Sequence, residues 1–580
     1  MKILGLHFGS HDASATLVID GELIAVMEEE RFNHKKHTNV FPAESISFCL
    51  EQGGLNWSDI DLIAYANNAE ITNVFKNNFI DMDYEGAFTP PMSSQKHIEA
   101  ELRKEFAKHW GNVDTKLFYT DHHTAHAASV FYLSPYKESA IFTVDGMGNW
   151  ITTTSCIGKD DDIKTLHRIG HPHSLGLCYG AVTQYAGFKG NCDEGKTMGL
   201  APYGKPKYVD FFQKICRVEG DLIELDLSYF EFHKNTLLNS EGHARRWYSE
   251  RMVEALGSAR VPESKITDHF ADVACSIQQV YEAGCYTMLE HLYKKTGNRN
   301  LCLSGGGALN CSMNGRISTQ TSFDNVFVMP APNDAGLSIG AAMVAERKCS
   351  PKTFKRNPLL HAYYGSEHSE EEIKNALSNL RDPHINISKP KHLVEIVADK
   401  LVEFEIVGWY QGRMEFGPRA LGHRSILANP TRADSKNHVN SRVKFRENFR
   451  PFAPITPLEE VHNYFKIDGE SPYMLKITPV KEKKQSIIPA VTHVDGSARV
   501  QTVTRDQNEQ IYDLLYCMKK RIGVPVLLNT SFNVRGNTIV RTPSDALSDF
   551  LNTGMSSLVI GPYLLSKLNP ATLCKNPKAV

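Results

Sequence analysis

The sequence predicts an α/β protein with two domains, the first of which is built from two related halves. Three observations support this fold class. At 580 residues, the chain is too long for a single hydrophobic core. A strand followed by a loop and a hairpin occurs close to the N-terminus and again near residue 140. From about residue 391, a new alternation of helical and extended patterns begins.

The first half is expected to begin with a strand at 3–9. Strands at 13–19 and 22–32 then flank Asp20-Gly21, a strong signal for a type I′ turn. Helical patterns follow at 43–53, 94–109 and 123–133.

The second half repeats this order. The three expected strands are 140–146, 150–158 and 163–169, and helices are expected at 174–188 and 266–295. The remaining units are a strand, glycine turn and helix at 301–317 and a strand, loop and helix at 326–348. Two related halves that each offer a loop to nucleotide phosphates are typical of the actin, Hsp70 and sugar-kinase ATPases.

The segment 351–390 is polar and rich in proline and lysine, and we assign it to a linker. The predicted domains are therefore 1–350 and 391–580. The second should contain a helix at 391–404, strands at 405–412, 524–532 and 557–565, and a helix at 543–553.

Composition excludes several classes of protein. The chain is 41% hydrophobic and 22% charged, has a net charge of −2, and lacks an apolar run long enough to span a bilayer or serve as a signal peptide. Its twelve cysteines never form CxxC, which is typical of reduced thiols in a cytoplasm. We expect a cytoplasmic protein that binds neither membrane nor nucleic acid, whereas its oligomeric state stays open.

The stretch Glu415–Ala428 carries two arginines, Arg419 and Arg424, among glycine, proline and alanine. We interpret it as a tight turn that presents guanidinium groups to a small multi-anionic ligand. Between residues 411 and 450, nine basic residues stand against three acidic ones, a local charge of +6. Such a concentration predicts a phosphate or nucleotide pocket.

A metal site is predicted from Asp121-His122-His123-Thr124-Ala125-His126. On a helix, His122 and His126 share one face at a separation that suits one metal ion. The alternative is a histidine-rich first turn capped by Asp121. Asp145 and Asp334 both lie in loops after expected strands and could complete the site. Two histidines with carboxylate suit Fe²⁺, Mn²⁺ or Zn²⁺.

Three other segments are candidates for ligand contact. His11 and Asp12 follow the first strand and could act as a general base and its orienting group, or form a capped turn. Gly305, Gly306 and Gly307 allow close approach of backbone N–H groups to a ligand. The loop 193–204, which contains Lys196, is interpreted as nucleotide- or substrate-facing, and Asn529 and Ser531 lie at the end of a strand, in a ligand position or an Asx turn.

Ten segments together resemble the O-carbamoyltransferases of nodulation factors, cephems, aminoglycosides and ansamycins. They are HDASA (11–15), DHHTAHAAS (121–129), VDGMGN (144–149), DEGKTMGLAPYG (193–204), SGGGALNCSMNGR (304–316), PAPNDAGLSIGAA (330–342), MEFGPRALGHRSILANP (414–430), KFRENFRPFAP (444–454), THVDGSARVQTV (492–503) and LLNTSFN (527–533).

The resemblance implies an N-terminal domain similar to TsaD, of the actin-like ATPase class, and a C-terminal domain similar to YrdC. It implies that carbamoyl phosphate and ATP, with Mg²⁺, form carbamoyl-adenylate in the C-terminal domain. The carbamoyl group would then pass to a hydroxyl of a small-molecule acceptor at an iron-type metal centre in the N-terminal domain.

The resemblance also implies roles for individual residues. The metal ligands would be His122, His126 and Asp334, with Asp145 close by. The adenylation pocket would draw on Arg419, Lys444, Arg450, Arg499, Asn529 and Ser531. The glycines at 305–307 would face the nucleotide in the N-terminal domain, and His11 would be the base for the acceptor hydroxyl.

Two alternatives from other classes are weighed against this one. Relatives of both domains occur in tRNA modification, but the basic residues form a compact group and not an extended stripe. A non-catalytic nucleotide-dependent switch would use the actin-like fold without carbamoyl chemistry.

Overall fold

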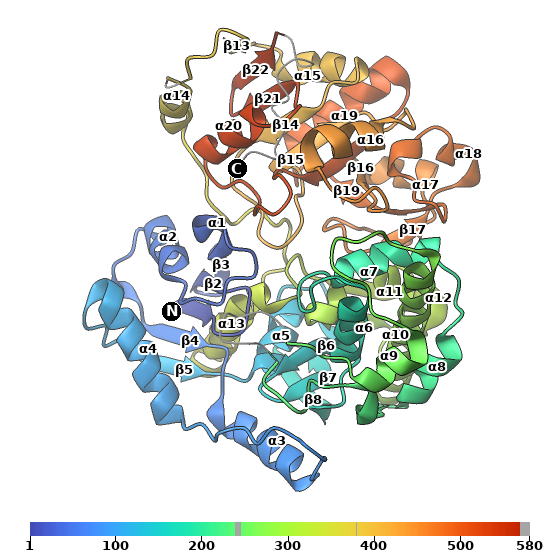
Figure 1. The fold of residues 1–580 in the computed structure, drawn as a ribbon. Helices are drawn as coiled ribbons and strands as arrows, with labels where there is room; N and C mark the ends of the chain where they lie inside the picture. The colour runs from blue at the N-terminus through green and yellow to red at the C-terminus, as the bar shows by residue number, and fades with distance from the viewer. Residues whose placement is uncertain (238–244, 379, 569–580) are drawn as a thin grey trace. The chain divides into compact units, whose positions relative to one another are not determined.

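The computed structural model of the protein describes residues 1–237, 245–378 and 380–568 (Figure 1). The chain divides into two compact units. The first comprises Met1–Glu29 and His37–Leu359, and the second comprises Glu30–Lys36 and Leu360–Val580. The short helix α1 (Glu30–Asn33) therefore belongs to the second unit although it follows the first hairpin in sequence.

The first sheet of the first unit has the strand order β3-β2-β1-β4-β5. The strand bounds are Lys2–His7 (β1), Ser14–Ile19 (β2), Glu22–Glu28 (β3), Leu62–Tyr65 (β4) and Leu117–Tyr119 (β5). Strand β1 pairs antiparallel with β2 and parallel with β4. Asp20 and Gly21 both have positive φ, at 48° and 82°, which confirms the left-handed turn expected there.

The second sheet repeats the first, with the order β8-β7-β6-β11-β12. Its strands are Glu138–Gly148 (β6), Ile151–Lys159 (β7), Asp162–Gly170 (β8), Asn300–Ser304 (β11) and Asn325–Val328 (β12). Strand β6 again pairs antiparallel with a hairpin partner and parallel with the next strand. The predicted duplication is confirmed, since both sheets place a hairpin on one side of a first strand and two parallel strands on the other.

Helices α5 (His122–Phe131) and α13 (Leu337–Cys349) pack against each other between the two sheets (Figure 1). Helix α13 contacts β1, β2 and β4, and α5 contacts β6 and β11. Glycine allows this close approach, because a Cβ at Gly340 would lie 1.9 Å from the carbonyl oxygen of Ala125. Both helices follow the last strand of their half, so they bring equivalent ends to the middle of the unit.

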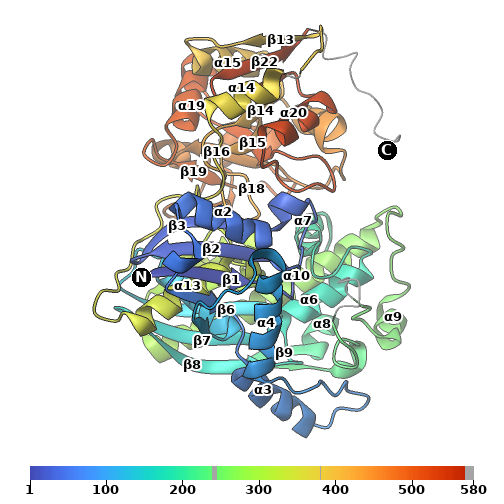
Figure 2. The ribbon, with the colours of Figure 1, turned by 90° about the vertical axis from the view of Figure 1, so that its left-hand side faces the viewer.

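The other helices of the first unit are peripheral to this pair, and α3 lies at its far edge in both views (Figures 1 and 2). Their bounds are Ala43–Gly53 (α2), Ala69–Asp81 (α3), Gln95–Trp110 (α4), Leu175–Tyr185 (α6), Glu194–Leu200 (α7), Val209–Ile215 (α8), Glu250–Leu256 (α9), Asp268–Thr296 (α10), Cys311–Asn314 (α11) and Ile317–Gln320 (α12). A short hairpin of β9 (Cys216–Glu219) and β10 (Leu222–Leu225) completes the unit.

The helix expected after the glycine turn is broken. A 3₁₀ turn at Gly306–Leu309 is followed by the short α11 and α12. Asn310 interrupts the helix because its side chain accepts from the N–H of Met313 and so starts a new turn. The third strand also ends at Glu28 and not near 32, because the chain turns into α1.

The second unit contains a sheet of the order β13-β22-β21-β14-β15-β20-β16-β19. The strands are Ile385–Ser388 (β13), Val407–Tyr410 (β14), Arg424–Ala428 (β15), Ala453–Pro457 (β16), Gln501–Val503 (β19), Leu527–Ser531 (β20), Ser557–Ile560 (β21) and Tyr563–Lys567 (β22). Strands β17 (Ile477–Pro479) and β18 (Ser497–Arg499) form a separate pair.

Side chains from opposite faces of this sheet enter two hydrophobic cores. On β14, Trp409 belongs to the core shared with α15 (Leu393–Val402) and α19 (Glu509–Ile522), whereas Tyr410 belongs to the core shared with α20 (Pro543–Leu551). The remaining helices are Glu370–Ser378 (α14), Ser435–Val439 (α16), Val461–Tyr464 (α17) and Glu482–Gln485 (α18).

Two details of the second unit differ from the sequence-based expectation. The segment 351–390 is not wholly irregular, since it contains α14 and β13, and β13 pairs with β22 at the edge of the sheet. The single strand expected at 557–565 is a hairpin of β21 and β22, because Gly561 adopts φ +53° at the turn. No helix among the described residues is both long and apolar enough to cross a bilayer.

Candidate functional site

His122 and His126 lie on the first turns of α5, which is capped by Asp121. The Asp121 carboxylate accepts from the N–H of Thr124 at 2.9 Å, as Asp does at helix N-termini. The i, i+4 spacing places both imidazoles on one face, where they are buried. Their Nε2 atoms lie only 3.1 Å apart.

Two carboxylates meet these imidazoles. Asp145 lies near the end of β6 and Asp334 begins the 3₁₀ turn after β12, so both occupy carboxyl ends of strands. The Asp145 Oδ2 atom lies 3.0 Å from His122 Nε2 and 3.7 Å from His126 Nε2. The Asp334 Oδ1 atom lies 3.5 and 3.7 Å from the same two nitrogens. The structure therefore brings all four predicted metal-site residues together.

The donor set fits a divalent transition metal. One atom from each of the four side chains lies within 4.8 Å of the other three, and all four residues are buried. The Asp334 residue is 1% exposed, and its Oδ1 atom has no hydrogen-bond partner among the described residues. A buried carboxylate oxygen without a donor is costly unless a cation satisfies it. Two histidines and two carboxylates suit Fe²⁺, Mn²⁺ or Zn²⁺.

The charges of this cluster compensate one another. Burial acts to lower the pKa of His126, but hydrogen bonds and attraction to Asp145 and Asp334 outweigh it and raise the pKa to about 9. Burial acts in the opposite direction on the two carboxyls, yet the neighbouring imidazoles hold the pKa of Asp145 and Asp334 well below its usual range. The cluster thus stabilises positive charge at its centre.

His11 and Asp12 lie beside the cluster, in the loop between β1 and β2. Asp12 Oδ2 lies 2.9 Å from His11 Nδ1 and accepts from Asn333 Nδ2 at 2.6 Å. The Nε2 atom of His11 lies 3.7 Å from Asp334 Oδ2. Asp12 thus fixes one imidazole nitrogen while the other faces the candidate metal ligands. Burial acts to lower the pKa of His11, but the charges of Asp334 and Asp12 outweigh it and raise the pKa to about 10.

His37 is a site residue that the sequence did not reveal. Its Nδ1 atom lies 2.7 Å from Asp12 Oδ1, opposite the oxygen that contacts His11. The ligand atoms of His11, Asp12 and His37 also lie within 4.8 Å of one another. Neither the 25-residue separation nor the basic segment around His37 predicts this contact, because it depends on how the chain returns after β3.

The glycines at 305–307 hold the site in place. Gly305 has φ +89°, and a Cβ there would lie 2.2 Å from the carbonyl oxygen of Val144. The N–H of Gly306 donates to Asp145 Oδ1 at 3.1 Å. The backbone of these glycines thus approaches β6 closely and orients a candidate metal ligand, while their predicted contact with a nucleotide stays a prediction.

Lys196 lies on α7, and its Nζ atom donates to Asp193 Oδ2 at 2.9 Å. The preceding loop lies near the site, since the charge of Asp12 helps to raise the pKa of Cys192, a shift caused mainly by burial. Burial raises the pKa of Glu194 on α7, and the charge of His37 acts to lower it.

Arg424 does not have the role predicted from the sequence. It is fully buried, and its guanidinium lies 3.7 Å from the centre of the Tyr410 ring. It donates to the backbone carbonyl oxygens of Gln411, Gly412, His423 and Ser366 at 2.6 to 3.2 Å. The guanidinium group is therefore occupied in joining loop backbones, and the expectation that it faces a ligand is wrong. In the sequence, a guanidinium group that donates to carbonyl oxygens cannot be distinguished from one that donates to phosphate.

Lys444 and Ser531, expected in one pocket, are in contact in the second unit. The Lys444 Nζ atom is buried and donates to the carbonyl oxygen of Ser531 at 2.6 Å and to Asn533 Oδ1 at 2.6 Å. Burial holds its pKa well below the usual lysine range, and repulsion from Arg446 and Arg450 acts in the same direction. Asn529 donates to the carbonyl oxygen of Ala420, beside Arg419.

The basic residues of the second unit are close enough to repel one another. Burial lowers the pKa of Arg446 well below its usual value, and the charges of Arg450 and Arg499 lower it further. Arg450 lies 3.8 Å from the carboxylate of Glu447. Grouped cations that raise one another's energy are typical of a site that receives an anion. Arg446 was not singled out from the sequence, although it lies in the basic segment.

Fold and site together define a two-unit α/β enzyme with a candidate metal centre and a separate cationic site, and comparison with known proteins supplies its family. Residues 2–343 match the family described as "Carbamoyltransferase N-terminus" and residues 398–567 match "Carbamoyltransferase C-terminus". The chain belongs to the carbamoyltransferase family, and the protein is a carbamoyltransferase.

Relatives match over nearly the whole chain. An uncharacterized protein of Synechocystis is 37% identical over 97% of this chain and 96% of its own length. "Nodulation protein NolNO" of Sinorhizobium fredii is 36% identical over 96% of this chain and 79% of its own. The "3'-hydroxymethylcephem-O-carbamoyltransferase" of Amycolatopsis lactamdurans is 26% identical, over 95% and 96%.

Solved structures match at lower similarity. HypF of T. kodakarensis is 15% identical with a TM-score of 0.32 and covers 61% of this chain and 48% of its own. The ROK hexokinase of Thermus thermophilus is 14% identical with a TM-score of 0.31, over 60% of this chain and 100% of its own. Likeness at this level adds nothing to the assignment.

Proposed function

We propose that the protein is an ATP-dependent O-carbamoyltransferase that works in two stages, one in each unit. Water would hydrolyse carbamoyl phosphate to carbamate and phosphate in the second unit, and an oxygen of that carbamate would attack the α-phosphate of ATP. The products of that step are carbamoyl-adenylate and pyrophosphate. In the first unit, a hydroxyl of a small-molecule natural product or glycan would attack the carbamoyl carbon, so that AMP leaves and the carbamate ester remains.

The observation that carries this proposal is the cluster of His122, His126, Asp145 and Asp334 beside an oriented His11. The relative named as an O-carbamoyltransferase supports a hydroxyl as the acceptor. A divalent metal held by the four side chains would supply Lewis acidity for the carbamoyl carbonyl or the adenylate phosphate. A cation held by Asp334 and its neighbours would oppose the carboxylates that raise the pKa of His11, so that His11 could take the hydroxyl proton at Nε2 while Asp12 keeps the imidazole in position through Nδ1.

The first stage is supported by the cationic site of the second unit. Carbamoyl phosphate and ATP are both multi-anionic, and bringing them together requires several fixed cations with Mg²⁺. Arg446, Arg450 and Arg499 form such a group, with Lys444 beside them, and bound phosphate would relieve their mutual repulsion. Arg419, Asn529 and Ser531 would contact the same ligands.

The two stages can be separated by experiment. The purified protein, mixed with ATP, Mg²⁺ and carbamoyl phosphate, should release pyrophosphate and form carbamoyl-adenylate that mass spectrometry detects. Arg419→Ala should abolish both products. His126→Ala should retain both but lose bound transition metal, measured by mass spectrometry of the metal content, and should fail to carbamoylate any acceptor.

His97→Ala is the matched control for the histidine variant, because His97 is an exposed residue of α4 in the same unit. It should retain metal and both activities. Loss of pyrophosphate release in His126→Ala would contradict the assignment of the two stages to separate units.

A further inference from the structure

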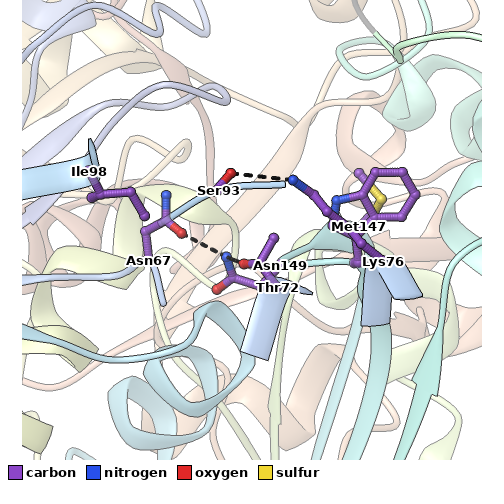
Figure 3. Close-up of a pocket in the computed structure, with 8 residues that line it drawn as sticks. Asn67, Thr72, Lys76, Ser93, Ile98, Met147 and Asn149 are labelled. Carbon is purple, nitrogen blue, oxygen red and sulfur yellow. Dashed lines mark hydrogen bonds between the residues drawn. The ribbon is translucent and has the colours of Figure 1, made fainter. Parts of the chain in front are cut away.

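A cavity of about 280 Å³ lies in the first unit, against the turn that joins β6 and β7 (Figure 3). Its volume is just below the range in which proteins usually bind small ligands, ~300 to 1,000 Å³, and so suits no more than one ring. The lining residues come from α3, the segment before it, the start of α4 and the β6–β7 turn. They are Asn67, Thr72, Lys76, Ser93, Ile98, Met147, Asn149 and Trp150.

The cavity shares a wall with the candidate metal centre. Asn149 Oδ1 accepts from the backbone N–H of His122 at 2.8 Å. Its Nδ2 atom donates to Asn67 Oδ1 at 2.9 Å and to Thr72 Oγ1 at 2.8 Å (Figure 3). Gly148, the neighbour of Asn149, lies directly on the His122 ring. The cavity therefore adjoins the segment that carries the candidate metal ligand His122.

Trp150 lines the cavity beside Asn149 and has an unfavourable backbone conformation. Asn149 and Trp150 form the two-residue turn between β6 and β7, and both have positive φ, at 51° and 63°. Asparagine is common at the first position of such turns, but the second is usually glycine. The indole packs against the buried rings of Phe79 and His171, with ring centroids 5.2 and 5.0 Å away, and it also lines the cavity. An indole offers a flat apolar surface on which the face of a ring can lie.

Lys76 supplies the charge of the cavity. It is 7% exposed, and its Nζ atom donates to the carbonyl oxygen of Pro91 at 2.8 Å and to Ser93 Oγ at 3.4 Å (Figure 3). Among the described residues, no carboxylate lies within ion-pair distance of it, and burial lowers its pKa. An ammonium carries three donors, so one remains for a ligand. A nearly buried cation without an acidic neighbour favours a ligand that brings the negative charge.

We propose that this cavity binds the acceptor and that the acceptor presents a sugar-sized ring with several hydroxyls and an acidic substituent. The Asn67 amide and the Ser93 hydroxyl suit hydroxyls, whereas Asn149 and Thr72 already donate within the protein. Trp150 suits the ring face, and Lys76 suits the acid. Because the lining contains no carboxylate, an amino sugar would bring a second cation next to Lys76 and would be disfavoured. This inference rests on the proposed function and names its substrate class.

Binding without ATP or carbamoyl phosphate tests the cavity separately from the donor reaction. Three probes that share a ring suffice: methyl glucuronide, methyl glucoside and methyl glucosaminide. Calorimetry and saturation-transfer NMR should show that the wild-type protein binds the glucuronide at least tenfold more tightly than the glucosaminide. Lys76→Met should reduce this ratio to below threefold. Lys96→Met, the same change at an exposed lysine on α4, should leave the ratio unaltered.

A second variant covers the case in which Lys76→Met fails to fold. Trp150→Gly introduces the residue that the turn prefers, and it should weaken the binding of all three probes at least fivefold. Equal binding of the three probes by the wild-type protein, no binding of any of them, or an unchanged ratio in Lys76→Met would overturn the proposal. None of these results would affect pyrophosphate release, which reports on the proposed function alone.

Discussion

His37 and His11 contact opposite oxygens of the same carboxylate, that of Asp12, at 2.7 and 2.9 Å. Asp12 adopts φ +55°, an uncommon conformation for a residue with a side chain. The carboxylate thus lies between two imidazoles, and His37 fixes its orientation from the side opposite His11. His37 is in our interpretation a positioning residue for the proposed base.

Replacing His37 should therefore slow transfer without affecting the donor reaction. His37→Ala should lower kcat for carbamoylation by about 10- to 100-fold, as expected for an outer hydrogen-bonding partner. His37→Gln, which can still donate to Asp12, should recover most of that loss. Steady-state kinetics with an acceptor that the wild-type protein carbamoylates would check this prediction. An effect confined to KM would argue against a positioning role.

Gly148 offers a steric test of the candidate metal centre. A Cβ at this position would lie 2.1 Å from Cδ2 of His122, so Gly148→Ala must displace the imidazole or the strand. The variant should lose bound metal and transfer activity, while pyrophosphate release continues. Gly146→Ala is the control from the same strand, because the nearest atom to its Cβ is 3.6 Å away. Metal retained equally in both variants would show that His122 is not a ligand.

Arg424 should prove to be a structural residue. Arg424→Ala would remove a donor from four carbonyl oxygens, of which those of Gln411 and Ser366 are in buried hydrogen bonds, and each buried unsatisfied group costs about 1 to 3 kcal/mol. We expect a loss of at least about 3 kcal/mol in the free energy of unfolding by urea denaturation. Arg432→Ala removes an exposed ion pair to Asp434 and should cost below about 1 kcal/mol. Comparable stability of the two variants would restore a ligand-binding interpretation of Arg424.

The pH dependence of stability should contain a contribution from Asp549 on α20. Burial raises the pKa of this carboxyl to about 6, although Lys444 acts in the opposite direction. Since the folded-state pKa exceeds the unfolded one, the stabilisation is fully present below the unfolded pKa and is lost as the pH rises through about 6.

Asp549→Asn removes this titration while keeping the shape of the side chain. Relative to the wild-type protein, it should be more stable at pH 8 by about 2 to 3 kcal/mol, from roughly 1.4 kcal/mol per pKa unit. The difference should disappear near pH 4. Urea denaturation at both pH values measures it, and a constant difference would refute the assignment.

The sequence predicted much of the first unit because its signals are local. The turn at Asp20-Gly21, the i, i+4 histidines and the repeated strand–hairpin order each depend on neighbouring residues. The contact between Asp12 and His37 depends on the path of the chain after β3, and no local pattern encodes it.

The prediction for Arg424 was wrong for a different physical reason. An arginine beside glycines looks the same in sequence whether its partners are phosphate oxygens or loop carbonyls, since both are hydrogen-bond acceptors. The sequence predicts one strand at 557–565 because the apolar residues of this segment form an almost continuous run. Only the conformation of Gly561 reveals the turn.

The repeated order of the two sheets has a consequence for the history of this site. His122 and Asp334 occupy corresponding places, each near the start of the helix that follows the last strand of its half. The loop with His11 and the turn with Asn149 likewise follow corresponding first strands. A progenitor made of one half, paired with an identical copy about a twofold axis, would have brought each of these places to the centre twice. Two fused copies of such a half can diverge, so that one loop carries the proposed base and the corresponding turn borders the cavity.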